Sequence, residues 1–293
     1  MAERRGREHE PRTGFVLSGG GNLGVSQVGM LMALLERGIL PDVVVGTSVG
    51  AYNGAALATE PTLSRLELLA EVWASMKGEE VFPGGPLTRA WNLLRRDDHL
   101  FSNEGLFKLF DRAGSAERFD QLAVPLRVVA TDLDSGDEVV FAAGPLRPAV
   151  LASAALPGLF PPVDHDGRAL VDGAVVNGVP LWHALSGPVD RVYVLNVSGA
   201  ERTRPIRSPL DVAVRAFAIA RNQRFDLELR HLPTDIDVIV LPRPDDDREL
   251  LDFGDGLTLI DEARHLAGKA LDAVPAIATG RAPRRSWWFR RSA

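Results

Sequence analysis

Two short apolar segments, each followed at once by glycines and then by a helical pattern, fill the first 60 residues of the chain. Phe15–Leu17 leads into three consecutive glycines, and apolar residues then recur at helical spacing from Gly24 to Arg37. Val43–Val45 leads into a second turn with glycines, after which alanines continue as a second helix. Strands that alternate with helices pair in parallel, because each helix carries the chain back to the same end of the sheet. The sequence therefore predicts an α/β fold built on a mainly parallel sheet.

The rest of the chain continues this alternation with one interruption. Further strand patterns fall at 126–133, 138–141, 169–171, 191–197 and 237–241, and further helical patterns at 62–77, 149–156, 208–230 and 257–271. Residues 78–118 have no strand pattern and contain many aromatic side chains, so we expect a helical insertion there. We expect a single domain. A flexible leader at 1–13 precedes the core at 14–200, which includes the insertion. Helices and a strand at 201–280 complete the same domain, and a basic aromatic tail follows at 281–293.

The composition excludes several classes of function. The apolar share of 45% and the charged share of 25% are those of an ordinary globular protein, and a net charge of -6 argues against nucleic-acid binding. The chain has no cysteine, which excludes disulfides, thiol catalysis and thiolate metal sites. The N-terminal residues do not form a secretory signal, and no stretch reaches the roughly 18 apolar residues of a membrane span. We therefore expect the protein to be cytoplasmic.

The second turn, Gly46-Thr47-Ser48-Val49-Gly50, has the form of a nucleophile elbow. A serine between a strand and a helix lies on a sharp turn, and glycines two residues to either side remove the clashes that this turn creates. The hydroxyl then stands clear of the sheet, and the next backbone N–H is free to stabilise developing negative charge. The alternative is a tight turn with a capping serine. The strand before the turn and the alanine-rich helix after it favour Ser48 as a nucleophile.

The first glycine run, Gly19-Gly20-Gly21-Asn22-Leu23-Gly24, has two functional interpretations. It fits the G-x-G-x-x-G pattern of dinucleotide-binding proteins, which would make the chain an NAD(P)-binding oxidoreductase. That site needs an acidic residue at the end of the second strand, but the nearest acid, Asp42, precedes the strand. Alternatively, consecutive glycine N–H groups at a helix start can face the oxyanion of an acyl transfer. The missing acid favours the oxyanion interpretation.

A serine nucleophile also needs a base, and its usual partner is a histidine. The histidines that follow Ser48 stand at 99, 165, 183, 231 and 265, and none shares the strand-end setting of the two glycine motifs. Asp172 has that setting, because it ends the strand 169–171 and is followed by Gly173 and Ala174. Its carboxylate can take the Ser48 proton directly, in a two-residue Ser–Asp arrangement. The alternative role of an aspartate before glycine is that of a turn residue.

Five segments, taken in chain order, resemble the motifs of the patatin-like phospholipases. They span roughly residues 14–200, and the set is Leu17-Ser18-Gly19-Gly20-Gly21-Asn22-Leu23-Gly24, Gly46-Thr47-Ser48-Val49-Gly50-Ala51, Ala130-Thr131-Asp132-Leu133, Ala152-Ser153-Ala154-Ala155-Leu156-Pro157 and Asp172-Gly173-Ala174. Each motif is modest alone, but five in the same order make coincidence a poor explanation.

The resemblance implies a three-layer α/β/α sandwich with a mainly parallel central sheet. It also implies a dyad without histidine, with Ser48 as nucleophile and Asp172 as general base. The backbone N–H groups of Gly19, Gly20 and Gly21 would then form the oxyanion hole. The residues that would support the motifs are Gly24, Gly46, Gly50, Gly173 and Ala174. Family members cleave acyl esters of phospholipids, galactolipids or neutral glycerides without calcium at the catalytic centre, so the resemblance implies a lipid substrate and no cofactor. Leu23 departs from the family pattern, which usually has Arg or Lys there.

Two aromatic regions are candidates for contact with lipid. The insertion 78–118, with Phe82, Trp91 and Phe101, suits an apolar wall for an acyl chain or a lid, and ordinary core packing is the alternative. The tail at 284–291 flanks aromatic residues with arginines, which suits a peripheral membrane surface, and an arm packed on the domain is the alternative. The leading hypothesis is a lipid acyl hydrolase. The other hypotheses are an NAD(P)-binding oxidoreductase and a catalytically silent lipid-binding protein.

Overall fold

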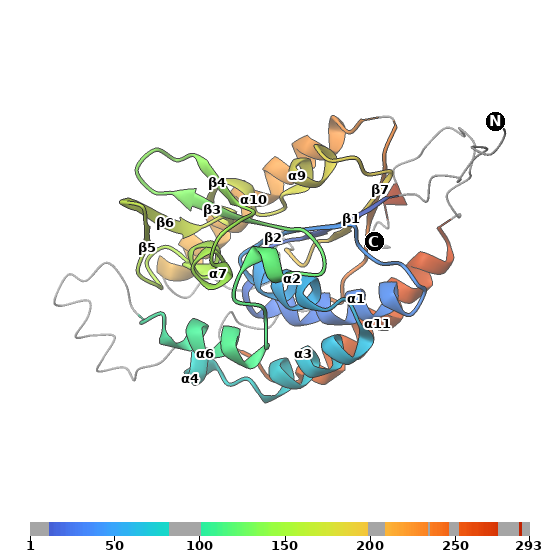
Figure 1. Cartoon of the computed structure of the whole chain (residues 1–293), viewed down its shortest axis with the longest axis horizontal. Helices are drawn as coiled ribbons and strands as arrows, with labels where there is room; N and C mark the ends of the chain where they lie inside the picture. The colour runs from blue at the N-terminus through green and yellow to red at the C-terminus, as the bar shows by residue number, and fades with distance from the viewer. Residues whose placement is uncertain are drawn as a thin grey trace, which may run out of the picture.

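The computed structural model describes residues 12–81, 101–198, 209–233, 235–245, 252–274 and 287–288. Within these ranges, nine strands form one sheet in the order β5-β6-β3-β2-β1-β7-β8-β9, and β4 pairs with β3 (Figure 1). The strands are β1 (Thr13–Leu17), β2 (Val43–Thr47), β3 (Leu126–Asp132), β4 (Glu138–Phe141), β5 (Val163–His165), β6 (Arg168–Asp172), β7 (Arg191–Leu195), β8 (Asp237–Val240) and β9 (Trp287–Trp288).

The sheet is mainly parallel, as predicted. Strands β3, β2, β1, β7, β8 and β9 pair in parallel, whereas β4, β5 and β6 join by antiparallel pairing. Tight turns connect β3 to β4 and β5 to β6, because Gly136 and Gly167 adopt the positive φ angles that these turns need.

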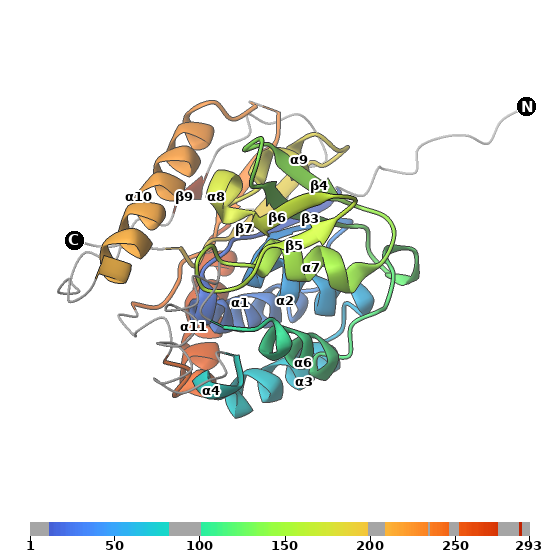
Figure 2. The ribbon, with the colours of Figure 1, turned by 90° about the vertical axis from the view of Figure 1, so that its left-hand side faces the viewer.

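Helices cover both faces of the sheet, so the predicted three-layer α/β/α architecture is confirmed. The described helices are α1 (Val25–Leu35), α2 (Val49–Thr59), α3 (Leu63–Ser75), α4 (Gly78–Val81), α6 (Glu104–Arg112), α7 (Leu146–Ala154), α8 (Ala174–Asn177), α9 (Leu181–Leu185), α10 (Pro209–Arg230) and α11 (Gly256–Asp272), with 3-10 turns η1 (Gly21–Gly24) and η2 (Phe119–Gln121). Helices α8, α9 and α10 lie on one side of the sheet, and α1, α2, α7 and α11 lie on the other (Figures 1 and 2). Helices α3, α4 and α6 lie on that second side, further from the sheet.

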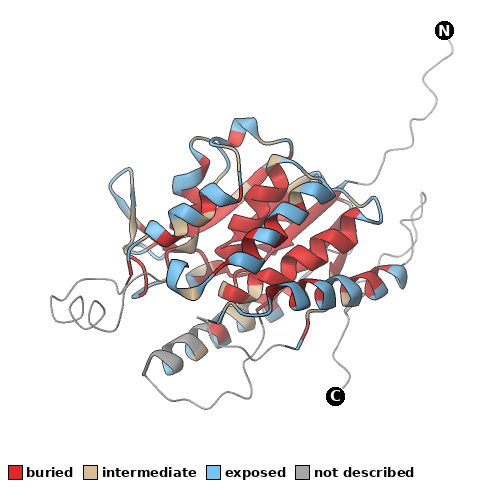
Figure 3. Ribbon diagram, turned by 90° about the horizontal axis from the view of Figure 1, so that it is seen from below, coloured by how far each residue is buried: buried red, intermediate tan, exposed pale blue. Residues whose placement is uncertain are grey.

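Helices α1 and α2 are buried almost throughout, as Figure 3 shows from below. They lie between the sheet and the outer helices, so they have no face that is left to solvent. This position explains why α1 is mostly apolar and why α2 is built largely from small residues that allow close packing. Helix α2 begins directly after Ser48.

The ends of β2 and β6 meet beside β3, and this junction positions the two predicted catalytic residues. β2 pairs with β3 residues 126–129 and β6 with residues 130–132. β4 pairs with β3 residues 128–131, a range that overlaps the residues paired with β2 and those paired with β6. Two strands that pair with the same residues lie on opposite edges of β3, so β2 and β6 both lie on the edge opposite β4. Because β2 is parallel and β6 antiparallel to β3, the two strands run toward each other, and their carboxyl ends converge.

Several regions that were singled out in the sequence fall wholly or partly outside the described residues. Of the leader, Arg12 and Thr13 are described, and Thr13 already belongs to β1; residues 1–11 lie outside. Phe82 and Trp91 of the insertion also lie outside, as does most of the tail. The backbone of Trp287–Trp288 pairs in parallel with β8, next to Ile239 and Val240. In the part of the chain that the structure describes, no helix combines the length and the apolar composition that a bilayer crossing requires.

Candidate active site

Ser48 occupies the sharp turn between β2 and α2, with φ of 56° and ψ of -126°. A non-glycine residue is strained in this region, so its surroundings have to hold it there. The Ser48 N–H donates a hydrogen bond of 2.8 Å to the hydroxyl of Ser153, which donates in turn to the Val129 carbonyl at 2.6 Å. The motif around Ser153 therefore supports the turn directly.

The structure brings Asp172 to Ser48, as the resemblance implied. The Ser48 hydroxyl donates to Oδ2 of Asp172 at 2.6 Å, and the Ala174 N–H donates to Oδ1 at 2.8 Å. Asp172 is fully buried, and this burial raises the pKa of its carboxyl to about 6, although the bonds from Ser48 and Ala174 and the charge of Arg221 oppose the shift. At neutral pH the carboxyl is therefore ionised and remains a stronger base than an exposed aspartate.

The three consecutive glycines at the start of the glycine loop, Gly19, Gly20 and Gly21, differ in their hydrogen bonding. The Gly19 N–H donates to the Gly178 carbonyl at 2.9 Å, and the Gly19 carbonyl accepts from Ser198 at 2.8 Å. Within the described residues, the N–H groups of Gly20 and Gly21 have no acceptor in the protein. Gly21 has a φ of 58°, a left-handed conformation that glycine adopts without strain, and it lines the pocket described below. Two of the three predicted donors are thus free to bind an anion.

Glycines also allow the first glycine loop and the elbow to touch. A Cβ at Gly24 would lie 2.2 Å from a methyl group of Val49, and a Cβ at Gly50 would lie 2.3 Å from the Leu17 carbonyl oxygen. Neither position can accept a side chain without displacing the neighbouring motif. Gly46 and Gly173 lie beside this contact, at the end of β2 and directly after β6.

A buried network of amides supports the glycine loop from below. The Trp73 indole N–H donates to the Asn53 side chain at 3.0 Å, and the Asn53 amide donates to the Gly24 carbonyl and to Gln27, both at 2.9 Å. Gln27 then donates to the Ser18 carbonyl at 2.8 Å. The sequence interpretation missed Gln27 and Asn53. The available signal was their polarity, since each stands among apolar or small residues in a helix with no exposed face.

An apolar pocket opens beside Ser48 on the α1 and α2 side of the sheet. Its cavity volume is about 70 Å³, within about 650 Å³ of non-atom space that includes open solvent. Apart from Gly21, Asn22 and Ser48, its wall is built from apolar and aromatic side chains, namely Val49, Tyr52, Trp73, Met76, Val81, Leu106, Leu109, Phe110, Val150, Leu151, Ala154, Leu156, Phe160 and Phe253. The described part of the insertion 78–118 therefore supplies a share of the wall, and Phe101 packs on the wall residue Phe160.

Leu23 and the histidines have other surroundings. Leu23 is half-buried and packs against the apolar core on the α1 side of the sheet. His183 bonds to Glu138, and His165 contacts Phe141 and Asp166. Among the histidines that the structure describes, none is hydrogen bonded to Ser48.

Comparisons with known proteins converge on one family. The family model for patatin-like phospholipase matches residues 15–185. Patatin-like phospholipase domain-containing protein 7 of Rattus norvegicus is 32% identical over 64% of this chain and 14% of its own length. An uncharacterized NTE family protein of Mycobacterium tuberculosis is 31% identical over 65% of this chain and 50% of its own length. The chain thus matches half or less of each of these relatives.

Solved structures with a similar arrangement are more distant in sequence. VipD from Legionella pneumophila has 16% identity and a TM-score of 0.48, with 90% of this chain and 67% of that chain covered. Human GIVD cytosolic phospholipase A2 has 14% identity and a TM-score of 0.44, with 84% of this chain and 46% of that chain covered.

Proposed function

Because this chain belongs to the patatin-like phospholipase family, we propose that it is a lipid acyl hydrolase whose catalytic residues are Ser48 and Asp172. The observation that carries the proposal is the 2.6 Å hydrogen bond between the Ser48 hydroxyl and the Asp172 carboxylate. The two groups lie within the distance that direct proton transfer requires. The strained backbone of Ser48 supports the same role, because strain of this kind is typical of a nucleophile elbow.

The reaction would proceed through an acyl-serine. Asp172 accepts the hydroxyl proton as Ser48 Oγ attacks the carbonyl carbon of the ester, and a tetrahedral oxyanion forms. The intermediate collapses when the ester C–O bond breaks, and Asp172 returns the proton to the departing alcohol oxygen. A water molecule then gives its proton to Asp172 and attacks the acyl carbon. Collapse of the second intermediate releases the fatty acid and restores the Ser48 hydroxyl with the proton that Asp172 held.

The N–H groups of Gly20 and Gly21 would stabilise the oxyanion. Both belong to the loop that packs against the elbow, and neither meets an acceptor within the described part of the chain. Preorganised backbone donors stabilise an oxyanion well, because they need no rearrangement when the charge develops. Gly19 would act differently, since its N–H is already bonded to Gly178 and holds the loop in place.

The apolar pocket beside Ser48 would bind the acyl chain of a phospholipid or another acyl-ester lipid. Its wall offers few polar partners, so it suits a hydrocarbon chain better than a sugar or a nucleotide. Leu23, in place of the family's usual cation, would leave the loop without a charged contact for an anionic head group. A peripheral contact with a membrane through the tail at 281–293, in a cytoplasmic protein, is part of the same proposal.

A fluorophosphonate probe tests the proposal, because such a probe labels only an activated serine. We expect one covalent adduct, and mass mapping should place it on Ser48. Asp172→Ala should abolish the labelling, while the circular dichroism spectrum stays that of the native protein. No adduct on folded wild-type protein would favour a silent lipid-binding protein, and saturable NAD(P) binding in a fluorescence titration would favour the oxidoreductase.

A further inference from the structure

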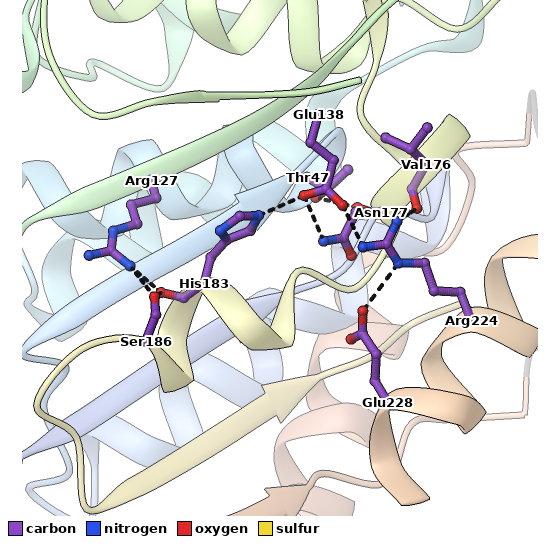
Figure 4. Close-up of polar contacts among 9 residues, drawn as sticks. All are labelled: Thr47, Arg127, Glu138, Val176, Asn177, His183, Ser186, Arg224 and Glu228. Carbon is purple, nitrogen blue, oxygen red and sulfur yellow. Dashed lines mark hydrogen bonds and ion pairs between the residues drawn. The ribbon is translucent and has the colours of Figure 1, made fainter. Parts of the chain in front are cut away.

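A cluster of charged residues lies on the side of the sheet opposite the pocket, behind the dyad. Glu138 of β4 is its centre, and Figure 4 shows His183, Asn177 and Arg224 converging on it. The Glu138 carboxylate accepts from His183 Nε2 at 2.7 Å and from the Asn177 amide at 3.2 Å, and it pairs with the Arg224 guanidinium. His183, as the largest contribution, lowers the pKa of Glu138 to about 2, so this carboxylate is ionised at neutral pH. The reaction proposed above uses none of these side chains.

The cluster holds the short segment that follows Asp172. Arg224 donates to the Val176 carbonyl and the Asn177 amide donates to Glu138, so the end of α8 is tied to β4 and to α10. α8 has only four residues. A helix of this length is unstable alone, because nucleation fixes several residues for a single hydrogen bond. Its position therefore depends on such tertiary contacts.

The same segment contacts all three motifs of the candidate site. The Ala174 N–H donates to the Asp172 carboxylate at 2.8 Å. The Asn177 carbonyl accepts from the hydroxyl of Thr47, the neighbour of Ser48, at 2.9 Å. The Gly178 carbonyl accepts from Gly19 at 2.9 Å. A displacement of residues 174–178 would therefore move the base, the elbow and the glycine loop relative to one another.

We propose that Glu138 is a positioning residue for the reaction: it fixes α8 and Gly178 through Asn177 and Arg224, and thereby keeps the Asp172 carboxylate aligned with Ser48. This inference rests on the function proposed above. Glu138 contacts neither the pocket nor Ser48, so its effect is on the rate of proton transfer and not on the binding of the acyl chain. Small errors in the placement of a reacting pair lower the rate strongly.

The experiment compares Glu138→Ala and Glu138→Gln with a matched control, Asp237→Asn. Asp237 is likewise a carboxylate in an ion pair, with Arg191 at 2.9 Å, and it is buried where Glu138 is half-buried. Asp237 and Arg191 both stand at the amino ends of their strands, away from the site. The measurements are the second-order rate constant of fluorophosphonate labelling, kcat and KM for a chromogenic fatty-acyl ester, and the midpoint of thermal unfolding.

We expect Glu138→Ala to lower the labelling rate and kcat about tenfold while KM changes less than about twofold. Glu138→Gln should lose less, because the amide oxygen still accepts from Asn177. Asp237→Asn should lower the unfolding midpoint and leave the labelling rate of the folded protein unchanged. A wild-type labelling rate in Glu138→Ala would overturn the inference, and so would equal losses of rate in Glu138→Ala and Asp237→Asn.

A double-mutant cycle keeps the inference testable if Glu138→Ala does not fold. Glu138→Met keeps most of the side-chain volume but removes the acceptor. Glu138→Met and Asn177→Ser should have effects on the labelling rate that are not additive, because both substitutions break the hydrogen bond between Glu138 and Asn177. Additive effects would contradict action through α8. Wild-type protein that is folded but not labelled at Ser48 would overturn the proposed function and this inference together, whereas labelled wild-type protein with an unaffected Glu138→Ala would overturn this inference alone.

Discussion

Ser48 lies at the end of a central strand, between the two faces of the sheet, and the residues on these two faces differ in character. The face under α1, α2 and α7 is apolar and contains the pocket, which leaves almost no polar group near the predicted acyl chain. On the opposite face, the apolar core beneath α9 and α10 adjoins the charged cluster around Glu138, and this cluster holds the segment after Asp172. The sheet thus separates the pocket from the groups that position the carboxylate. The proposed function predicts that substitutions on the two faces change different kinetic constants.

The largest effect should come from the two residues at the junction of the faces. Ser48→Ala removes the nucleophile and Asp172→Ala removes the base, so each should lower kcat for a fatty-acyl ester by at least about 10³-fold. The two losses should not add in the double variant, because the residues act as one unit. Steady-state hydrolysis with circular dichroism as the fold control measures this. Full activity in either single variant would exclude the dyad.

A substitution on the apolar face should change substrate preference. Ala154 lines the pocket, and Ala154→Phe would fill part of the space for an acyl chain. We expect kcat/KM for a long-chain ester to fall about 10- to 100-fold while hydrolysis of an acetyl ester changes little, because only the long chain needs that space.

The matched control is Ile219→Phe on the outer side of α10, where Ile219 is exposed. It should leave the ratio of long-chain to acetyl hydrolysis unchanged. An equal loss for both esters in Ala154→Phe would mean that the pocket does not hold the acyl chain.

The pH dependence should report the buried carboxyl at the junction. Burial raises the pKa of Asp172 to about 6, and only the ionised form can accept the Ser48 proton. We therefore expect kcat/KM for a short-chain ester to fall as the pH drops through about 6, by roughly tenfold per pH unit below it. A profile that is flat from pH 5 to 7, with the fold intact, would show that another group is the base.

The smallest effect should be one on stability. The pKa of Asp172 is about 6 in the folded protein and 3.8 ordinarily, so the folded state binds this proton more tightly than the unfolded state does. Stability from this group is therefore complete below pH 3.8 and is lost as the pH rises through about 6.

Asp172→Asn removes the buried charge. The free energy of unfolding of the variant relative to wild type should therefore be roughly 1–3 kcal/mol higher at pH 7 than at pH 4. Urea unfolding of wild type and variant at both values measures the difference. A difference in stability that is the same at pH 4 and at pH 7 would contradict a raised pKa for Asp172.

Local patterns were enough to predict most of the architecture. The apolar runs before Gly19 and Gly46, and the helical spacing after them, predicted the parallel strands β1 and β2, and the resemblance to the patatin-like phospholipases implied the three-layer fold. The elbow at Ser48 was also predictable, because its strained turn needs glycines at fixed neighbouring positions. Features of this kind depend on residues that are close in sequence, and so the sequence by itself determines them.

Other features depend on segments that meet only in the folded chain. Ser48 and Asp172 are 124 residues apart in the sequence. They are in contact because β2 and β6 pair with the same edge of β3 in opposite directions, so that their carboxyl ends meet. The Gly19 N–H is bonded because the Gly178 carbonyl lies next to it, whereas the N–H groups of Gly20 and Gly21 meet no acceptor within the described residues. Glu138 stood in an ordinary strand pattern, and it gains its partners only through the approach of α8, α9 and α10. The sequence determined which local structures form and where the proposed nucleophile lies, whereas the tertiary structure decided the hydrogen-bond partners of Ser48, since burial and long-range pairing set these.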